Sequence, residues 1–506
     1  MPSRYRLLAL DASYIADPSS LLSEIWSGSS ARPHESSAPQ WGELVAHIKR
    51  AGARTLLIQL HVRDPDFIAE YEAVYAKQHR DMQRFCVRVH AFDRDTPESS
   101  DEQDVLRFVD ETCVQSPSCY LGFVTLRPLR QAPVGASIVV DVKGARSLCK
   151  DRFPVHIAGN TFHVVGTPYL QQDSTVGACA QASIWMALRT LRRRSGGAAY
   201  SPAELTIAAT EFMAFDRVFP GRSGLTVEQM LAAIRASDHD PLVISLRQSD
   251  PVTKTGFTNP FEVMERVQPY VESGLPVILL LHHENGGHAV VAIGLAPGAA
   301  NNMSPPGLLV HNDNQGPYRV LPFSPTEKDY ALNQCVSAIV PLPQGVLMPA
   351  VEAESQAFNL IQFWIGTVAL DPAQAGQGLS NLWVRTYLCT RHAFRKWAKQ
   401  STMLDPIAKD LYRTHGMPKL VWVMEVHDGS SFDPQNPGKQ TRLGEIVLDA
   451  AADALHGDPF VFVRITAPMV KGGANSPGLL AYEEASSLKL NVADPCEGIV
   501  EPWDHM

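Results

Sequence analysis

The fold of this chain is decided by the stretch Gly166-Thr-Pro-Tyr-Leu-Gln-Gln-Asp-Ser-Thr-Val-Gly177, which runs directly into Ala178-Cys-Ala-Gln-Ala-Ser-Ile-Trp-Met-Ala-Leu-Arg-Thr-Leu-Arg192. The first part is rich in turn-forming residues. The second is rich in strong helix formers, contains no Gly or Pro, and is closed by Ser195-Gly-Gly197. We therefore expect a loop that leads into a long helix, with Cys179 in its first turn.

Helices precede strands in the region that follows. Ser201-Pro-Ala-Glu204 has the form of a capping box that starts a second helix. Periodicity predicts further helices at 226–237 and 260–272, then strands at 276–282, 288–293 and 307–311. Helices first and strands afterwards are typical of the α+β class, and we place this domain at residues 166–345.

The two flanking regions have different patterns. Residues 1–165 alternate strands (6–10, 55–60, 85–90, 120–126 and 137–142) with helices (41–51 and 65–77), which predicts an α/β domain. Residues 346–506 contain a helix at 390–400 and strands at 419–426 and 460–466, which predicts an α+β domain. The sequence assigns neither flanking domain a role.

Composition restricts the class of protein. The chain has 506 residues, enough for about three domains. Its net charge of −9 lacks the basic excess typical of nucleic-acid binding, so no nucleic acid is expected. Apolar runs such as Val277-Ile-Leu-Leu-Leu281 are far too short to cross a membrane, and the N-terminal apolar run is too short for a signal peptide. The eight dispersed cysteines indicate free thiols in a reducing cytoplasm, with no metal and no cofactor.

Cys179 is the strongest candidate for chemistry. Unpaired N–H groups and the helix dipole at a helix start favour a thiolate, so we expect the pKa of this cysteine to be lowered. A buried structural cysteine is the competing interpretation, since free cysteines are usually buried. Two nearby amides, Gln171 and Gln172, can donate to a developing oxyanion.

Suitable partners for Cys179 follow downstream. His288 lies in Gly286-Gly-His-Ala-Val-Val-Ala-Ile-Gly294, where a two-glycine turn delivers a histidine to a strand start as a candidate general base. Asp313 follows the next strand and can orient the imidazole. His311 competes with His288 for the base role, and Asn312 competes with Asp313 for the orienting role.

These motifs resemble the papain-like cysteine peptidases, and they are most similar to the double-glycine leader peptidase branch. The resemblance covers residues from about 167 to 323. It implies a papain-like core with a helical half and an antiparallel β half. It also implies a Cys179-His288-Asp313 triad that hydrolyses peptide or isopeptide bonds through an acyl-enzyme. Asp313 is favoured over Asn312 because the family's acid or amide commonly stands three residues before the glycine that is here Gly316.

The oxyanion position departs from the family pattern. The family usually places its oxyanion glutamine six residues before the cysteine, and Asp173 occupies that position here. Gln172, seven residues before, is the candidate donor instead. The backbone N–H of Cys179 supplies the second donor, as the resemblance implies.

Three alternatives remain. The same triad can serve an acyltransferase, or the middle domain can be a catalytically silent binding or sensor module. A zinc site at His282, His283, Glu284 and His288 is disfavoured, because the spacing H-E-x-x-x-H and the intervening Asn-Gly-Gly do not align ligands on one helix face. The expected partner is a peptide or protein substrate, with a regulatory protein acting through the flanking domains as a further expectation.

Overall fold

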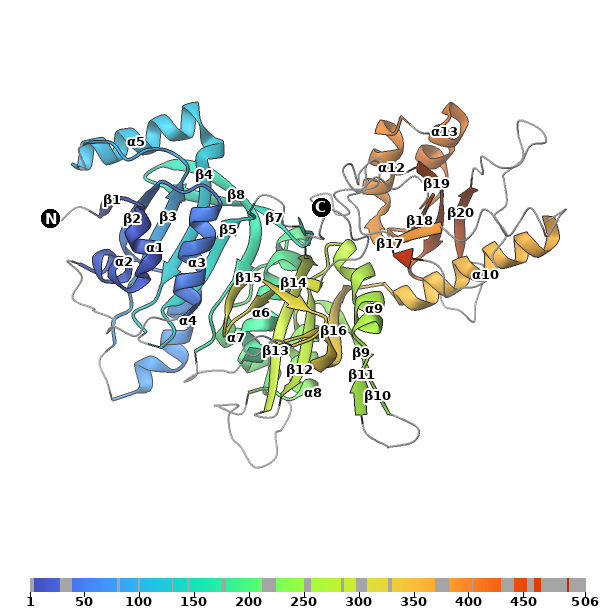
Figure 1. Cartoon of the computed structure of the whole chain (residues 1–506), viewed down its shortest axis with the longest axis horizontal. Helices are drawn as coiled ribbons and strands as arrows, with labels where there is room; N and C mark the ends of the chain where they lie inside the picture. The colour runs from blue at the N-terminus through green and yellow to red at the C-terminus, as the bar shows by residue number, and fades with distance from the viewer. Residues whose placement is uncertain are drawn as a thin grey trace.

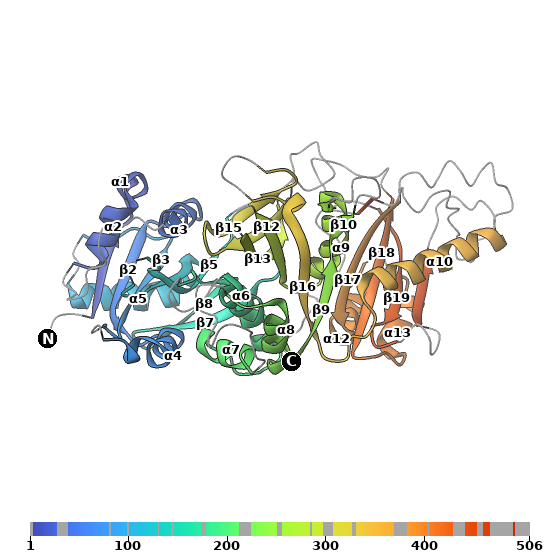
Figure 2. The same cartoon turned by 90° about the horizontal axis from the view of Figure 1, so that it is seen from below.

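The computed structural model describes residues 4–27, 39–79, 82–98, 101–129, 131–142, 146–173, 179–211, 224–249, 256–283, 286–296, 307–325, 330–368, 382–402, 404–428, 441–452, 459–465 and 489–490. Over these residues the chain is a mixed protein of helices and predominantly antiparallel sheets, which confirms the predicted α+β class. Three large sheets follow one another along the molecule in sequence order (Figures 1 and 2).

The N-terminal sheet has the strand order β1-β2-β3-β4-β5-β8-β7. Its strands are β1 (Tyr5–Ala9), β2 (Thr55–Val62), β3 (Cys86–Phe92), β4 (Tyr120–Leu126), β5 (Val134–Val140), β7 (Asp151–Ile157) and β8 (Asn160–Tyr169). The accompanying helices are α1 (Ala12–Ala16), α2 (Pro18–Ile25), α3 (Pro39–Arg50), α4 (Pro65–Ala73) and α5 (Glu102–Gln115).

Strand direction in this sheet differs from the predicted α/β arrangement. All of its pairings between described strands are antiparallel, whereas an α/β domain is built on parallel strands. Alternation of strand and helix along the sequence sets the order of the elements. It does not set the direction in which each strand enters the sheet, and the α/β assignment was wrong for that reason.

The central region begins with helices and ends in a sheet, as predicted. Its helices are α6 (Cys179–Arg194), α7 (Pro202–Ala209), α8 (Val227–Ala236) and α9 (Pro260–Glu272). The expected capping box is present at the start of α7, where the N–H of Ser201 donates to Glu204 Oε2 at 2.8 Å. The main strands are β9 (His239–Ser245), β12 (Val277–His283), β13 (Gly286–Leu295), β14 (Gly307–Asn312), β15 (Gly316–Pro322) and β16 (Cys335–Pro343).

The central sheet has the order β15-β14-β13-β12-β16-β9, with antiparallel neighbours. A short strand from the N-terminal region, β6 (Arg146–Ser147), pairs with the far end of β13. A separate small hairpin is formed by β10 (Arg247–Ser249) and β11 (Gly256–Thr258). The central sheet therefore includes residues from both sides of position 165.

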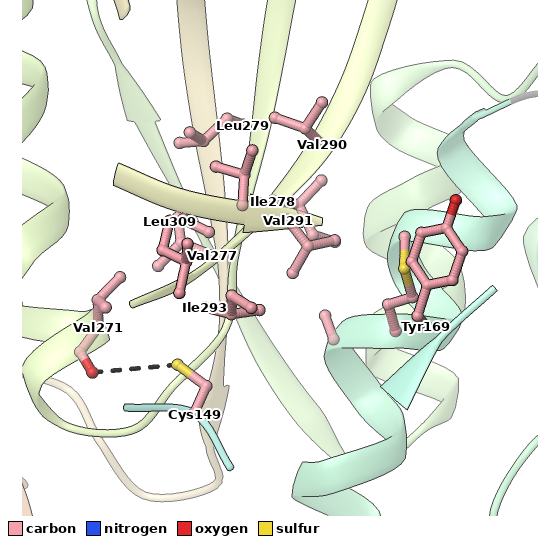
Figure 3. Close-up of a cluster of buried hydrophobic side chains, with 14 of the residues drawn as sticks. Cys149, Tyr169, Val271, Val277, Ile278, Leu279, Val290, Val291, Ile293 and Leu309 are labelled. Carbon is pink, nitrogen blue, oxygen red and sulfur yellow. Dashed lines mark hydrogen bonds between the residues drawn. The ribbon is translucent and has the colours of Figure 1, made fainter. Parts of the chain in front are cut away.

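The hydrophobic core is centred on β12 and β13, where residues 277–279 and 288–295 are buried on both faces of the sheet. Figure 3 shows side chains from the central strands together with Cys149 and Tyr169 from the preceding sequence and Val271 from α9. The same apolar cluster extends from Leu10 in the N-terminal region to Ala450 in the C-terminal region. Burial of this surface from water joins the three sheets to one another.

The C-terminal region forms a third sheet, in the order β20-β19-β18-β17-β21. Its elements are α10 (Ala350–Val368), β17 (Leu382–Thr390), α12 (Arg391–Gln400), α13 (Pro406–Thr414), β18 (Leu420–Asp428), β19 (Thr441–Asp449), β20 (Phe460–Ile465) and β21 (Lys489–Leu490). A buried ion pair links it to the central region, with Arg385 Nε 2.9 Å from Glu272 Oε2. Within the described part of the chain, none of the helices combines the length and apolar character needed to cross a bilayer.

Candidate active site

Cys179 begins α6 and lies against the strand that carries His288. The N–H of Ala289, the residue after His288, donates to Cys179 Sγ at 3.3 Å. One turn further along α6, the hydroxyl of Ser183 donates to the carbonyl of Ala289 at 3.1 Å. These two contacts hold the first turns of α6 against β13, so the structure brings Cys179 and His288 together from positions 109 residues apart (288 − 179).

The imidazole of His288 is buried and held from two directions. Its Nε2 lies 3.0 Å from Asn312 Oδ1. The other end of that amide, Asn312 Nδ2, donates to Gln315 Oε1 at 3.0 Å, so the oxygen faces the histidine. Tyr330 stacks on the ring with centroids 4.7 Å apart. Because Nε2 must donate to an amide oxygen, neutral His288 carries its proton there, and Nδ1 keeps the lone pair that a general base needs.

Asn312 and Asp313 both lie beside His288, but only Asn312 forms the hydrogen bond. The nearest carboxylate oxygen of Asp313 is 3.6 Å from Nε2. Both carboxylate oxygens of Asp313 are buried and accept no hydrogen bond from the described residues. Burial raises the pKa of Asp313 to about 8, and the nearby backbone N–H groups of Asp313 and Asn314 offset only part of that effect. Asn312, rather than Asp313, is therefore the residue that is hydrogen-bonded to His288 Nε2, and the neighbouring Asp313 carboxyl has a pKa above 7.

Burial also determines the protonation of the nucleophile. It raises the pKa of the Cys179 thiol to about 12, and the charge of Asp313 raises it further. Nearby backbone N–H groups, including that of Ala289, act in the opposite direction but do not prevail. The expectation of a lowered pKa was wrong, because loss of hydration outweighs the field at the helix start.

The pKa of His288 is lowered by burial, and the hydrogen bond with Asn312 compensates in part. Since the Cys179 thiol is also protonated at neutral pH, the pair described here is a neutral thiol beside a neutral imidazole. Transfer of the thiol proton to the imidazole is therefore unfavourable in the resting site, and any group that lowers the pKa of the Cys179 thiol favours it.

The three residues predicted around the oxyanion position have separate environments. Gln172 donates through Nε2 to Asn314 Oδ1 at 2.8 Å, and Asn314 in turn contacts His288, so Gln172 lies at the site. Gln171 is buried elsewhere, where its Oε1 accepts from the N–H of Val134 at 3.0 Å. Asp173 lies near Glu70 of α4, where burial raises the pKa of the Glu70 carboxyl and the charge of Asp173 adds to that effect. Of these three residues, Gln172 is the one whose hydrogen-bond partner, Asn314, also contacts His288.

His311 is separated from the reacting groups by its own hydrogen bonds. It is fully buried; its Nδ1 accepts from the N–H of Tyr318 at 3.2 Å, and its Nε2 lies 2.7 Å from Thr167 Oγ1. Burial lowers the pKa of His311 to about 3. With both ring nitrogens engaged, His311 packs between the central and N-terminal sheets and is not placed to act as a base.

The disfavoured zinc pattern receives no support from geometry. Glu284 lies outside the described residues, as does the side chain of His283, while His282 is exposed on β12. Within the part of the chain that the structure describes, no group of three or more His, Cys, Asp or Glu side chains could hold a metal ion.

Three residues at this site were not foreseen. Gln40, from α3 in the N-terminal region, donates through Nε2 to the carbonyls of Asp313 at 3.0 Å and Asn314 at 2.7 Å. Tyr330 stacks on the imidazole of His288, and Asn314 Nδ2 lies 3.4 Å from its Nδ1. Asn314 lies in the polar run after β14 and was within reach of motif analysis. Gln40 and Tyr330 carry no local signal, since only folding brings them to the site.

Comparison with known proteins finds no protein family model and no curated protein that matches the chain. The assignment of chemistry therefore depends on the site itself. The site offers a thiol, an imidazole with a hydrogen-bonded orienting amide, and a primary amide donor, all at the junction of a helix start and an antiparallel sheet. That set can support nucleophilic attack on a carbonyl carbon.

Proposed function

We propose that this chain is a cysteine peptidase that hydrolyses peptide or isopeptide bonds through an acyl-enzyme intermediate. The observation that carries the proposal is the convergence of Cys179, His288 and Asn312. Cys179 Sγ accepts from the N–H next to His288, and His288 Nε2 is oriented by Asn312 Oδ1. A nucleophile close to the strand residue that carries the base, and a base held by an orienting amide, are the groups that thiol hydrolysis needs.

The first half of the reaction forms a thioester. Nδ1 of His288 takes the thiol proton, and the Cys179 sulfur attacks the substrate carbonyl carbon. Gln172 and the backbone N–H of Cys179 donate to the developing oxyanion. As the C–N bond breaks, the leaving nitrogen takes the proton from His288, and the acyl group stays on sulfur.

The second half releases the acyl group. His288 takes a proton from water, the resulting hydroxide attacks the thioester carbonyl, and the C–S bond breaks. The sulfur recovers its proton from His288, and the product is a carboxylic acid. Asn312 keeps Nε2 in place through both halves, so that Nδ1 faces the reacting atoms each time.

The resemblance to a papain-like core supports this proposal through element order. Residues 179–236 supply helices, and residues 277–343 supply most of an antiparallel sheet, with the cysteine at the first helix and the histidine on the sheet. We infer that these elements are the two halves of a papain-like peptidase fold.

The proposal is tested by labelling and turnover. Purified protein is treated with iodoacetamide at pH 7, the rate at Cys179 is measured by peptide mass spectrometry, and cleavage of a denatured protein substrate is followed in parallel. We expect Cys179→Ala to abolish cleavage and His288→Ala to slow labelling of Cys179. A wild-type rate of cleavage in Cys179→Ala would overturn the proposal. Cys335→Ala, which alters a buried cysteine of the central sheet, is the matched control and should cleave like wild type.

A further inference from the structure

The side chain of Asn314 occupies the space between the proposed oxyanion donor and the proposed base. Its Oδ1 accepts a hydrogen bond from Gln172 Nε2 at 2.8 Å. Its Nδ2 lies 3.4 Å from His288 Nδ1, the nitrogen that must take the thiol proton. Tyr330, which stacks on His288, also interacts with Asn314; burial raises the pKa of the Tyr330 hydroxyl, and the ionised forms of Asp313 and Cys179 raise it further. The carboxamide of Asn314 therefore bridges Gln172 and His288 from the solvent-exposed side of the site.

The orientation of this carboxamide is that of a substrate amide. A scissile amide must direct its oxygen to the oxyanion donor and its nitrogen to the base that will protonate it. Asn314 presents its oxygen to Gln172 and its nitrogen to His288. We propose that the Asn314 side chain holds the place of the scissile amide in the resting site, and that substrate must displace it before Cys179 can react.

The surrounding contacts allow the side chain to leave without disturbing the loop. The backbone N–H of Asn314 donates to Asn312 Oδ1 at 2.9 Å, and its carbonyl accepts from Gln40 Nε2 at 2.7 Å. Asn314 as a residue is exposed to solvent. Rotation about its side-chain bonds therefore breaks the contacts with Gln172 and His288 while the backbone that orients Asn312 stays in place.

Displacement has two consequences for the chemistry. Nδ1 of His288 loses the amide donor that occupies its lone pair and becomes available for the thiol proton. Gln172 loses its partner and becomes available for the substrate oxygen. The ligand class that this space accepts is an amide, because an amide reproduces both contacts of Asn314. This inference rests on the proposed function, and it adds a built-in inhibitory contact to it.

The test compares Asn314→Ala and Asn314→Leu with wild type. Labelling of Cys179 by iodoacetamide at pH 7 is the readout, since it needs the base but not substrate turnover. Each of the two lost hydrogen bonds has a net value that corresponds to about a two- to tenfold change, so we expect labelling of Asn314→Ala to be faster by at least that factor. Asn314→Leu keeps the volume but not the hydrogen bonds, and we expect a smaller increase in the same direction. Val320→Ala, an exposed position on the same hairpin, is the control and should label at the wild-type rate.

A second readout tests the amide class. A blocked tetra-alanine peptide is added before iodoacetamide, and its protection of Cys179 is measured as a function of peptide concentration. Because the resting side chain competes with the peptide, we expect half-protection of Asn314→Ala at a lower concentration than wild type.

The outcomes separate this inference from the proposed function. If labelling depends on His288 but is equal in wild type and Asn314→Ala, the inhibitory contact is overturned and the peptidase proposal stands. If labelling ignores His288 in both backgrounds, the proposed function itself fails. Slower labelling of Asn314→Ala would show that Asn314 assists the base, and this too would overturn the inference.

Discussion

Replacement of Asn312 is the most informative single perturbation of the site. In Asn312→Ala, the buried N–H of His288 loses the acceptor that lies 3.0 Å away, and no water can reach it easily because His288 is only 6% exposed. An unsatisfied buried donor costs about 1–3 kcal/mol. If this cost destabilises the imidazole orientation that takes the thiol proton, labelling of Cys179 slows by about 5- to 150-fold, since about 1.4 kcal/mol corresponds to a tenfold change in rate.

The assay is the rate of Cys179 labelling by iodoacetamide at pH 7, with thermal melting to verify that each variant is folded. Asp313→Asn is the matched control. Its carboxyl has a pKa of about 8 and is protonated at pH 7, so the substitution exchanges one neutral group for another and should change the rate by less than about twofold. Asn312→Asp keeps an acceptor of the same size and should retain most of the activity lost in Asn312→Ala.

The opposite pattern would refute this reasoning. If Asn312→Ala labels as fast as wild type while Asp313→Asn slows strongly, Asp313 is the orienting residue, and the 3.6 Å contact shortens during the reaction. In that case the Cys179-His288-Asp313 triad implied by the family resemblance would hold, and the hydrogen bond between His288 and Asn312 would have no part in the reaction.

Three further predictions concern the surroundings of the site. The pKa of Asp313 is raised from 3.8 to about 8 on folding, so the folded state binds this proton more tightly and the stability of the wild type falls as pH rises through that range. The melting temperature of Asp313→Asn should equal that of wild type near pH 4 and exceed it by a growing amount up to about pH 8. A constant difference in melting temperature across the pH series would contradict this. Gln40→Met removes both hydrogen bonds from Gln40 to the carbonyls of Asp313 and Asn314. We expect kcat of the peptidase reaction to fall about fivefold or more, with KM nearly unchanged. An effect on KM alone would mean that α3 contacts the substrate instead. Glu272→Gln leaves buried Arg385 without its closest carboxylate and should lower the free energy of unfolding by about 3 kcal/mol in urea titrations. Glu262→Gln, which breaks a partly exposed pair on the same helix, should change it by less than about 1 kcal/mol. Equal effects would show that the buried pair contributes no more than the partly exposed one.

Local patterns in the sequence were sufficient to predict the helices and strands that carry the site. The helix after Gly177 and the capping box at Ser201 correspond to described elements. The strand expected at 288–293 is also present, but β13 begins at Gly286, so the two glycines belong to the strand and do not form a turn before it. Each depends on interactions between residues a few positions apart, such as helix propensity, N-terminal capping and strand periodicity. The proximity of Cys179 and His288 was inferred from the order of those elements together with the family resemblance.

Such patterns could not predict which of Asn312 and Asp313 forms the hydrogen bond with His288. The two residues are neighbours at the end of β14, so any spacing argument places both near the imidazole. Which one bonds to His288 depends on the turn from Asn312 to Gly316, and that turn is held by Gln40, more than 270 residues earlier in the chain.

The protonation state of the site was likewise decided by tertiary structure. The sequence correctly indicated a cysteine at a helix start, where a thiolate is favoured, but it contained no measure of how deeply that thiol would be buried. The sequence by itself determined which reactive groups the chain possesses and the elements that present them, because those depend on local chemistry. The tertiary structure was needed to place the amide of Asn312 against His288, to place the Asn314 side chain between Gln172 and His288, and to raise the pKa of the Cys179 thiol, because hydrogen bonding and loss of hydration depend on groups brought together from distant parts of the chain.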